Sequence, residues 1–318
     1  MIEKKFNLCG IDITPALPLS EICSMGVGGN SLYLSRVKTL DQLMKAVEIC
    51  ESSDLEYKVI GGGTNIIASD SGFSGVIIKN ETSQITIDSA RGRVIADSGV
   101  FLSNLIVQCA SQGLGGLDPL YGIPGTVGGA LINNAGSHGV AISDFARSFT
   151  LMDKEGPKTY KVEYLEPSYR KTKLKFVKKK PREVVLSVIF QFNSRKQEEV
   201  MSDLKKYKTI RQERQPLGIK TSGSIFSNPS GTDKATDDKS KNLSAGFLLE
   251  SSGAKRLSVG GARVSKKHAN WIENFNHATA SDVRKLIDLM RESVNEKYNI
   301  ILKEEVEYIG DWDLSSDE

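Results

Sequence analysis

A glycine-rich stretch at residues 122–136 has the composition of a backbone that comes close to an anionic ligand. It reads Gly-Ile-Pro-Gly-Thr-Val-Gly-Gly-Ala-Leu-Ile-Asn-Asn-Ala-Gly, with five glycines. Glycine costs backbone entropy in a regular element, but it allows positive φ and close approach of the main chain to a partner. Successive N–H groups in such a loop form a concavity that suits a diphosphate. The pattern favours an anion-binding loop, and a buried glycine-rich turn is the alternative.

A second glycine cluster, Gly61-Gly-Gly-Thr-Asn65, follows a short run typical of a buried strand, Tyr57–Ile60. A strand that opens onto a glycine loop is a common way to hold phosphate. The dinucleotide fingerprint G-x-G-x-x-G is absent, because Ile66 stands at the third glycine position. The P-loop is absent as well, since no Gly-Lys-Ser/Thr follows. The commonest nucleotide-binding folds are therefore disfavoured, while two phosphate-type loops remain.

Three further positions carry side chains that suit catalysis, and each has an ordinary structural alternative. A glycine before Ser224 would let its hydroxyl project from a tight turn, although a plain Ser/Gly turn is the simpler interpretation. The Gly-x-Ser-x-Gly elbow of hydrolases is absent. Arg170 stands just before a basic run, residues 171–182, which is typical of solvated surface. Glu305 lies in an alternating run, residues 303–307, typical of an edge strand with exposed acids.

The histidines and cysteines do not predict a metal site. The three histidines lack the spacing of metal ligands, and they are His138, His268 and His277. The four cysteines are scattered without a C-x-x-C pair, and they are Cys9, Cys23, Cys50 and Cys109. Free thiols are therefore expected rather than disulfides or zinc ligands.

Composition indicates a globular protein of two or three domains. The 318 residues include 42 basic and 39 acidic side chains, which gives a net charge of +3. A balance this even, without interleaved aromatic residues, argues against a nucleic-acid partner. No apolar run of membrane-spanning length is present, and the first twenty residues lack the apolar core of a leader peptide. We therefore expect a cytoplasmic protein with no membrane or nucleic-acid partner. A monomer with a small-molecule substrate is a separate expectation, which composition does not supply.

Capping signals and hydrophobic periodicity predict a mixture of helices and strands. Thr39 and Gln42 form a capping-box pattern before apolar residues at helical spacing. Ser103 reads as the cap of a helix that ends at Gly113. Residues 84–97 read as a hairpin, and further strands are expected near 148–153, 160–165 and 184–192 in an antiparallel sheet. Two more helices are expected, near 198–214 and from Thr279, the second with an apolar face of Val283, Leu286, Ile287, Met290 and Val294.

Several motifs, taken in their order along the chain, resemble the UDP-N-acetylenolpyruvoylglucosamine reductase family of flavin enzymes. The resemblance covers roughly residues 20–310 and is far more specific than either glycine loop alone. Its motifs are Met25-Gly-Val-Gly-Gly29, Gly61-Gly-Gly-Thr-Asn65 with Asp70, Gly122-Ile-Pro-Gly-Thr-Val-Gly-Gly129, Asn134-Ala-Gly136, Tyr169-Arg170, Gly223-Ser-Ile-Phe226 with Asn228-Pro229, His268-Ala-Asn270 and Glu305-Val306.

This resemblance implies an α+β protein with a vanillyl-alcohol-oxidase/PCMH-type, two-lobed FAD-binding fold and a C-terminal α+β substrate-binding domain. Together with a change in composition near residues 193–200, it suggests FAD-binding lobes at 1–80 and 81–195, a substrate domain at 196–310 and an acidic tail at 311–318. The polar segment 230–242 reads as a surface loop or insertion. The implied FAD contacts are Gly61, Gly62, Gly63, Thr64, Asn65, Gly122, Ile123, Pro124, Gly125, Thr126, Gly128 and Gly129.

The same resemblance implies a reaction and three catalytic residues. NADPH would reduce the flavin and leave, and the reduced flavin would pass hydride to the vinyl carbon of an enolpyruvyl sugar nucleotide. Ser224 would protonate the neighbouring carbon, while Arg170 and Glu305 would stabilise the enolic carboxylate between these steps. A slip of one residue would exchange Glu305 for Glu304, since neighbours on a strand face opposite ways. The implied substrate contacts are Asn228, His138 and His268.

Two other functions stay open from the sequence. One is a flavin oxidase of the same superfamily that acts on an alcohol or sugar, and the other is a non-catalytic nucleotide-binding module. The oxidase leaves the Gly223-Ser224 segment unexplained, and no histidine stands in an obvious covalent-flavin motif. The chain departs from the family pattern at Ser227, Arg256 and Lys303, which are not among the three implied catalytic residues.

Overall fold

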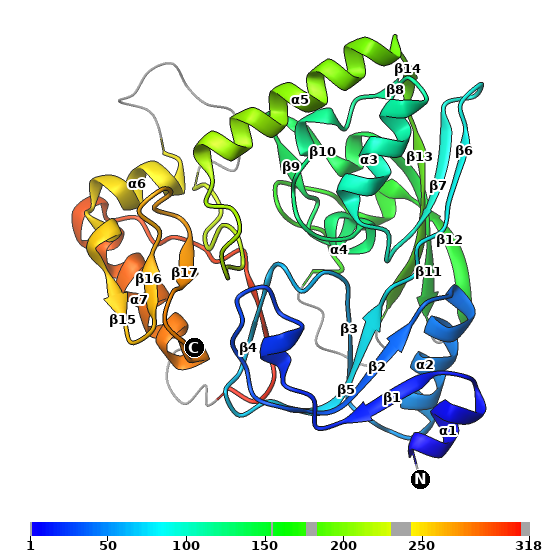
Figure 1. Cartoon of the computed structure of the whole chain (residues 1–318), viewed down its shortest axis with the longest axis horizontal. Coiled ribbons are helices and arrows are strands. Elements are labelled where there is room, and N and C mark those ends of the chain that lie inside the picture. The colour runs from blue at the N-terminus through cyan, green and yellow to red at the C-terminus, as the bar shows by residue number, and fades with distance from the viewer. Residues whose placement is uncertain (1, 154, 176–182, 230–242, 313–318) are drawn as a thin grey trace. The chain divides into compact units, whose positions relative to one another are not determined.

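The computed structural model describes the chain as two compact units (Figure 1). Unit 1 consists of Met1–Thr14, Leu34–Gly62 and Val76–Glu213, and unit 2 of Pro15–Tyr33, Gly63–Gly75 and Arg214–Glu318. The described residues are all except 1, 154, 176–182, 230–242 and 313–318. The predicted insertion at 230–242 and most of the predicted acidic tail therefore lie outside them. The predicted division at residues 80 and 195 stays a prediction.

A five-stranded antiparallel sheet forms the centre of unit 1, in the order β12-β11-β13-β7-β6. Its strands are β6 (Ile85–Asp88), β7 (Arg93–Asp97), β11 (Ala146–Asp153), β12 (Gly156–Lys161) and β13 (Val184–Gln191). The predicted hairpin and antiparallel sheet are confirmed. The strand expected to reach residue 165 is wrong beyond Lys161, because Val162–Leu165 turn into a 3-10 helix that buries Val162 and Leu165.

Two helices and the sheet share one apolar core in unit 1. Helix α3 (Leu102–Ser111) buries Leu102, Leu105, Ile106, Cys109 and Ala110, and α4 (Val127–Ile132) packs near β13 and β7. The predicted cap is wrong, because α3 begins at Leu102 after Phe101. The hydroxyl of Ser103 instead accepts a hydrogen bond from the Gly122 N–H at 3.2 Å. The side chain expected to start a helix thus anchors the glycine-rich stretch.

A second sheet has the strand order β1-β2-β5-β3, made of β1 (Asp12–Pro15), β2 (Ser31–Val37), β5 (Phe73–Asn80) and β3 (Tyr57–Ile60). Strands β3 and β5 are parallel, and β3 has the predicted bounds. Helix α2 (Leu40–Ser52) begins as predicted, with the Thr39 hydroxyl accepting from the Gln42 N–H. Helices α1 (Ile2–Leu8) and α5 (Gln197–Arg214) complete the longer elements of unit 1.

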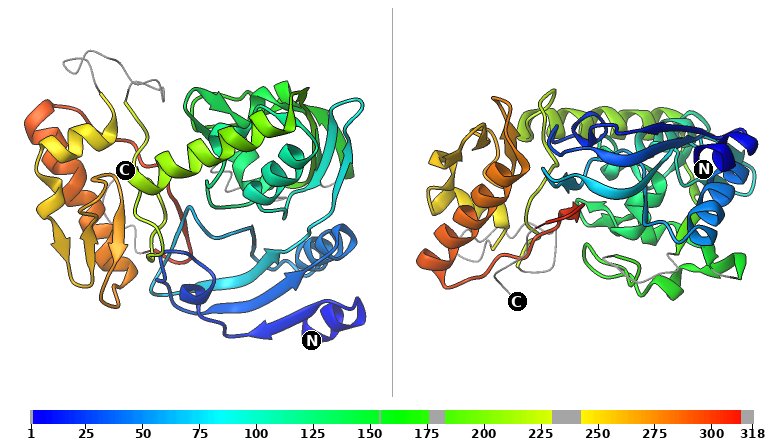
Figure 2. Two further views of the ribbon diagram at one scale, coloured as in Figure 1. Left: turned by 45° about the horizontal axis from the view of Figure 1, so that its top comes forward. Right: turned by 90° about the horizontal axis from the view of Figure 1, so that it is seen from below.

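In unit 2, helix α7 packs against helix α6 and against a small antiparallel sheet, β15-β16-β17. Its elements are α6 (Ala245–Ser251), α7 (Ala280–Tyr298), β15 (Ser258–Val259), β16 (Ala262–Val264) and β17 (Ile272–Asn274). Figure 2 shows α7 lying along this sheet. The predicted apolar face of α7 is buried as expected, and Thr279 forms the predicted capping box with Asp282.

A parallel strand pair in unit 2 joins segments that are distant in sequence. Strand β18 (Glu307–Ile309) pairs with β4 (Ile66–Ala68). Unit 1 also has the two-residue strands β8 (Leu114–Gly115), β9 (Gly136–Ser137), β10 (Val140–Ala141) and β14 (Asn193–Ser194). Within the described ranges, no helix combines the length and the apolar character needed to cross a membrane.

The four cysteines are free thiols, as expected. Cys9 is exposed, and the other three are buried. Burial, and then the nearby Asp118 carboxylate, raise the pKa of the Cys109 thiol to about 12. That thiol therefore acts as a small apolar side chain of the core rather than as a nucleophile.

Asp70 ties the loop after β4 to the start of α7 in unit 2. Its carboxylate accepts hydrogen bonds from the Ala280 N–H at 2.7 Å and the Ser281 N–H at 2.9 Å, and also from the Ser281 hydroxyl at 2.8 Å. The first N–H groups of a helix have no partner within the helix, so an acceptor here stabilises it. A negative charge also suits the positive end of the helix dipole.

We predict that Asp70→Ala lowers the free energy of unfolding by about 1 kcal/mol, the usual cost of losing a helix cap. The melting temperature should then fall by about 2–4 °C. Ser281→Ala is the matched control, because it removes the hydroxyl contact and keeps both backbone contacts. Scanning calorimetry of the two variants tests this, and equal losses in both would contradict the capping role.

Candidate active site

The two glycine loops contact each other within unit 1. Gly61 lies so close to Thr126 that a Cβ at residue 61 would collide with the Thr126 hydroxyl. Thr126 is buried and its hydroxyl faces the Gly129 N–H at 3.5 Å, at the start of α4. Residue 61 must therefore be a glycine if the first glycine loop is to pack against Thr126 of the second. Within unit 1, Gly61 and the second predicted cofactor loop therefore form one patch of backbone.

This patch has the character that an extended anionic cofactor such as FAD needs. Residues 122–125 and Gly129 reach solvent, whereas Thr126, Val127 and Gly128 are buried. The buried amides of Val127 and Gly128 donate to the carbonyls of Val100 and Ser98, so they serve the fold. The exposed glycines present the main chain itself, with no side chain to keep a ligand away. The residues present therefore fit the group that the sequence predicted.

Arg170 is held by a tight turn beside Gly136. The Ser168 and Lys171 backbones pair across the turn, the Asn134 amide donates to the Ser168 carbonyl, and Arg170 has a positive φ of 55°. A Cβ at Gly136 would lie 2.9 Å from Nη1 of Arg170. The Asn134-Ala-Gly136 motif thus makes room for the guanidinium and fixes the turn that carries it.

Arg211, a residue that sequence reasoning missed, lies near Arg170 in unit 1. Its Nε donates to the Tyr121 carbonyl at 3.1 Å, next to the glycine-rich stretch. Burial, and then the charge of Arg170, lower the pKa of Arg211. Two guanidinium groups close together are favourable when an anion lies between or beside them. One signal was present in the sequence: Tyr207 and Arg211 are four residues apart and share a face of α5.

His138, predicted to contact the substrate, lies against the same face of α5. Its ring is tilted on Tyr207, with centroids 5.2 Å apart. His138 is exposed and has a positive φ of 53°. The structure thus brings together Arg170, Arg211, His138 and Tyr207 as parts of unit 1.

Ser224 lies at the start of an extended segment in unit 2. Gly223 before it has φ of 80°, and the backbone of Ser224 pairs with Trp271. The buried side chain of Asn270 then holds Phe226 on both sides, accepting from its N–H at 3.0 Å and donating to its carbonyl at 2.8 Å. The His268-Ala-Asn270 motif therefore positions the segment that carries Ser224.

Glu305 belongs to the segment on the other side of residues 225–227. Its N–H donates to the Ile225 carbonyl at 2.8 Å, and the Ser227 N–H donates to the Lys303 carbonyl at 2.9 Å. The Asn65 amide donates to the Glu305 carbonyl at 3.0 Å. The structure thus brings the Ser224 and Glu305 segments side by side, and a residue of the first glycine loop holds one of them.

Glu304, the neighbour of Glu305, is occupied by an ion network. Its carboxylate accepts from Arg291, from Arg284 at 3.4 Å and from the Tyr308 hydroxyl. Burial first, and then the Glu304 carboxylate, raise the pKa of the Tyr308 phenol well above its usual range. Sequence reasoning missed this network, although Arg284, Asp288 and Arg291 form a charged stripe with helical spacing.

The other two predicted substrate contacts have structural partners in unit 2. The Asn228 side-chain oxygen accepts from the Ala245 N–H at 3.0 Å, at the start of α6. His268 packs against Gly246 of α6, and its Nδ1 accepts from the Asn270 N–H at 3.2 Å. Burial, and then Lys255, lower the pKa of His268, which favours a neutral ring at neutral pH. Their predicted contacts with substrate stay predictions.

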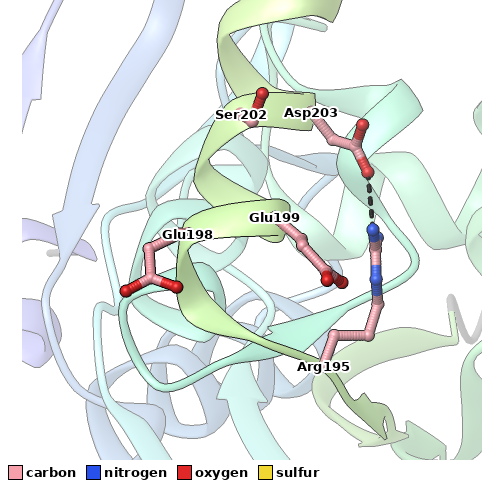
Figure 3. A pocket seen from close by; sticks show the side chains of 5 residues that line it. All are labelled: Arg195, Glu198, Glu199, Ser202 and Asp203. Carbon is pink, nitrogen blue, oxygen red and sulfur yellow. Dashed lines mark hydrogen bonds and ion pairs between the residues drawn. The ribbon is translucent and has the colours of Figure 1, made fainter.

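A shallow surface pocket elsewhere in unit 1 contains none of the predicted residues (Figure 3). It is lined by Arg195, Glu198, Glu199, Ser202 and Asp203. Arg195 pairs with Asp203 at 2.8 Å and with the buried Asp118 at 3.4 Å, so these charges serve to hold the start of α5. Among the residues that the structure describes, no group of three or more His, Cys, Asp or Glu side chains could hold a metal ion.

Comparison with known proteins matches both parts of this arrangement. Residues 32–158 match the model of an FAD binding domain. Residues 215–309, which contain Ser224 and Glu305, match the model described as UDP-N-acetylenolpyruvoylglucosamine reductase, C-terminal domain. The predicted α+β class, with an FAD-binding fold followed by a C-terminal domain, is confirmed.

Whole-chain relatives agree with these matches. The UDP-N-acetylenolpyruvoylglucosamine reductase of Caldicellulosiruptor bescii is 34% identical over 310 residues, covering 96% of this chain and 93% of the relative. That of Carboxydothermus hydrogenoformans is 32% identical, covering 92% and 93%. The crystal structure of the reductase from Thermus caldophilus superposes with a TM-score of 0.76 at 28% identity, over 94% of this chain and 99% of that one. The chain therefore belongs to the UDP-N-acetylenolpyruvoylglucosamine reductase family and carries its FAD-binding and C-terminal domains.

Proposed function

We propose that this protein uses NADPH and FAD to reduce UDP-N-acetylglucosamine enolpyruvate to UDP-N-acetylmuramate, a step in peptidoglycan precursor synthesis. The observation that carries the proposal is the pairing of the Ser224 segment with the Glu305 segment inside the matched C-terminal domain. A hydroxyl and a carboxylate that are far apart in sequence are thereby held by the same few backbone hydrogen bonds. Monomeric state and cytoplasmic location stay part of the proposal.

A bound FAD would supply the hydride chemistry, from NADPH to the vinyl carbon of the substrate. The residues that would hold it are those of the two glycine loops, with Gly61 and Thr126 fixing one loop against the other. The exposed main chain of residues 122–125 and Gly129 would lie along the cofactor. Asn65 would have two tasks, since its amide also holds the Glu305 carbonyl.

Ser224 would donate a proton to the carbon next to the one that receives hydride. Serine is a weak acid, so this donation requires a very basic enolic carbon and a hydroxyl held within reach. The clamp of Asn270 on Phe226 and the turn at Gly223 restrict where that hydroxyl lies. Positioning of this kind is a large part of the rate that enzymes achieve.

Arg170 and Glu305 would stabilise the charge that develops on the substrate carboxylate. A guanidinium offers a planar, permanently charged fork that matches a carboxylate. Arg211 adds a second positive charge near Arg170 and suits the same anion or the diphosphate of the sugar nucleotide. Fixed charges aimed at developing charge are a major source of rate enhancement. Further substrate contacts would come from Asn228, His138 and His268.

We predict that the purified protein is yellow, that NADPH bleaches it without oxygen, and that the enolpyruvyl sugar nucleotide restores the colour. Stopped-flow absorbance of the flavin measures both steps. An oxidase would instead be reduced by an alcohol or sugar and form hydrogen peroxide without NADPH. A non-catalytic nucleotide-binding module would bind nucleotide and show neither step.

Ser224→Ala should leave the bleaching by NADPH intact and slow the return of colour by at least about 100-fold, because only the second step needs a proton donor on carbon. Ser227→Ala is the matched control, since Ser227 lies on the same segment and its hydroxyl donates to the Lys303 carbonyl at 3.2 Å. Equal slowing of both steps by Ser224→Ala would contradict its assigned role.

Gly136→Ala should slow the return of colour by about 10-fold or more, because the new Cβ would lie 2.9 Å from the Arg170 guanidinium and would displace it. The slowing should be smaller in an Arg170→Ala background, where only the clash of the same Cβ with the Val140 carbonyl, also at 2.9 Å, remains. Single-turnover kinetics of the two single variants and the double variant test this. An additive slowing in the double variant would show that Gly136 acts by another route.

A further inference from the structure

The segment that carries Glu305 has two faces, and one of them is locked by the Glu304 network. The backbones of Phe226 and Glu304 pair directly across the two segments. Successive side chains of an extended segment point to opposite faces, so Glu304 and Glu305 are directed apart. The face that holds Glu304 is closed by α7, which supplies Arg284 and Arg291, and by Tyr308 of β18.

The network restrains both the segment and its partner. Arg291 also lies over the ring of Phe226, with its guanidinium carbon 5.9 Å from the ring centroid. Arg284 lies 5.0 Å from the centroid of Tyr308. Asp288 accepts from Arg291 at 2.9 Å and pairs with Arg284 at 3.5 Å, so both guanidiniums are held in place. Glu304 itself is only 16% exposed, which makes a change of its partners costly.

A shift of one residue in this segment would exchange the two neighbouring glutamates. It would bring Glu304 toward the site and leave Glu305 beside Arg291. The short pairing between residues 225–227 and 303–305 offers few backbone hydrogen bonds to prevent that shift. The side-chain network around Glu304 therefore has to hold residues 303–305 in the correct alignment with residues 225–227.

We propose that Glu304 is a positioning residue, which, through Arg291, Arg284 and Tyr308, holds the register that presents Glu305 to the substrate. This inference rests on the proposed role of Glu305. Glu304 would touch neither substrate nor cofactor and would act only through the segment that it anchors. Its effect should therefore appear in the step that uses Glu305 and not in the reduction by NADPH.

The kinetic test compares four FAD-loaded proteins by stopped flow: the parent, Glu304→Gln, Glu305→Ala and the double variant. Glu304→Gln should slow the return of colour by about 10- to 100-fold and leave the bleaching by NADPH within about twofold of the parent. The double variant should be no slower than Glu305→Ala, because Glu304 acts through Glu305. An additive slowing in the double variant overturns the proposal.

A matched control separates positioning from general loss of stability. Glu273→Gln removes the carboxylate of another ion pair in unit 2, with Arg263, in which the glutamate is 12% exposed. It should lower the melting temperature by a similar amount and leave both kinetic steps within about twofold of the parent. Tyr308→Phe removes a single hydrogen bond of the network. It is the milder variant, and it replaces Glu304→Gln in the kinetic test if that protein does not fold. It should slow the return of colour by about 2- to 10-fold.

A structural readout tests the register without catalysis. Hydrogen exchange should become about tenfold faster or more at the amides of Glu305 and Ser227 in Glu304→Gln, because both bonds depend on this pairing. The Ile225 amide, which donates to the Asn270 carbonyl on the other side, should keep its parental rate. Unchanged exchange at Glu305 and Ser227 overturns the proposal.

Failure of the proposed function gives a different result. If Glu305 has no role in the reaction, Glu305→Ala leaves the return of colour at the parental rate, whatever Glu304→Gln does. If Glu305 acts as proposed and Glu304 does not position it, Glu305→Ala slows the step and Glu304→Gln does not. The two single variants therefore distinguish which of the two proposals is wrong.

Discussion

The proposed placement of Ser224 and Glu305 in unit 2 depends on one short piece of backbone pairing, between residues 225–227 and 303–305. Two main-chain hydrogen bonds join these segments. On one side the buried amide of Asn270 completes the backbone pattern of Phe226, and on the other the amide of Asn65 holds the Glu305 carbonyl. The side-chain amides of Asn270 and Asn65 thus make the hydrogen bonds that a neighbouring strand would make with its backbone. They can do so because an amide offers the same donor and acceptor as a peptide group.

Much of the fold could be predicted because its signals are local. The Thr39 and Thr279 caps, the apolar face of α7 and the 84–97 hairpin depend on residues that are close in sequence, and all of them are confirmed. The error at Ser103 has a cause that is not local. Ser103 has the chemistry of a cap, but its hydroxyl serves the Gly122 amide instead, and a distant partner of this kind leaves no trace in a periodicity.

For the candidate site, the sequence predicted which residues take part. It did not predict the contacts between them. The motifs predicted roles for Arg170, Ser224 and Glu305, but they could not tell that Gly136 lies against Arg170 or that Asn270 holds Phe226. Arg211 was missed because an arginine on a polar helix is usually exposed to solvent. Its carbonyl partner, Tyr121, comes from a segment that is 90 residues away.

The bond between Asn65 and the Glu305 carbonyl spans 240 residues of chain, and this separation has a consequence for how the protein matures. Closing a loop of that length costs on the order of 5 kcal/mol of chain entropy, by the logarithmic dependence on loop length. Such a contact forms only when the elements between its ends are already ordered. During synthesis the two glycine loops leave the ribosome long before the segment that Asn65 holds. We therefore expect the contact between Asn65 and Glu305 to form late in folding.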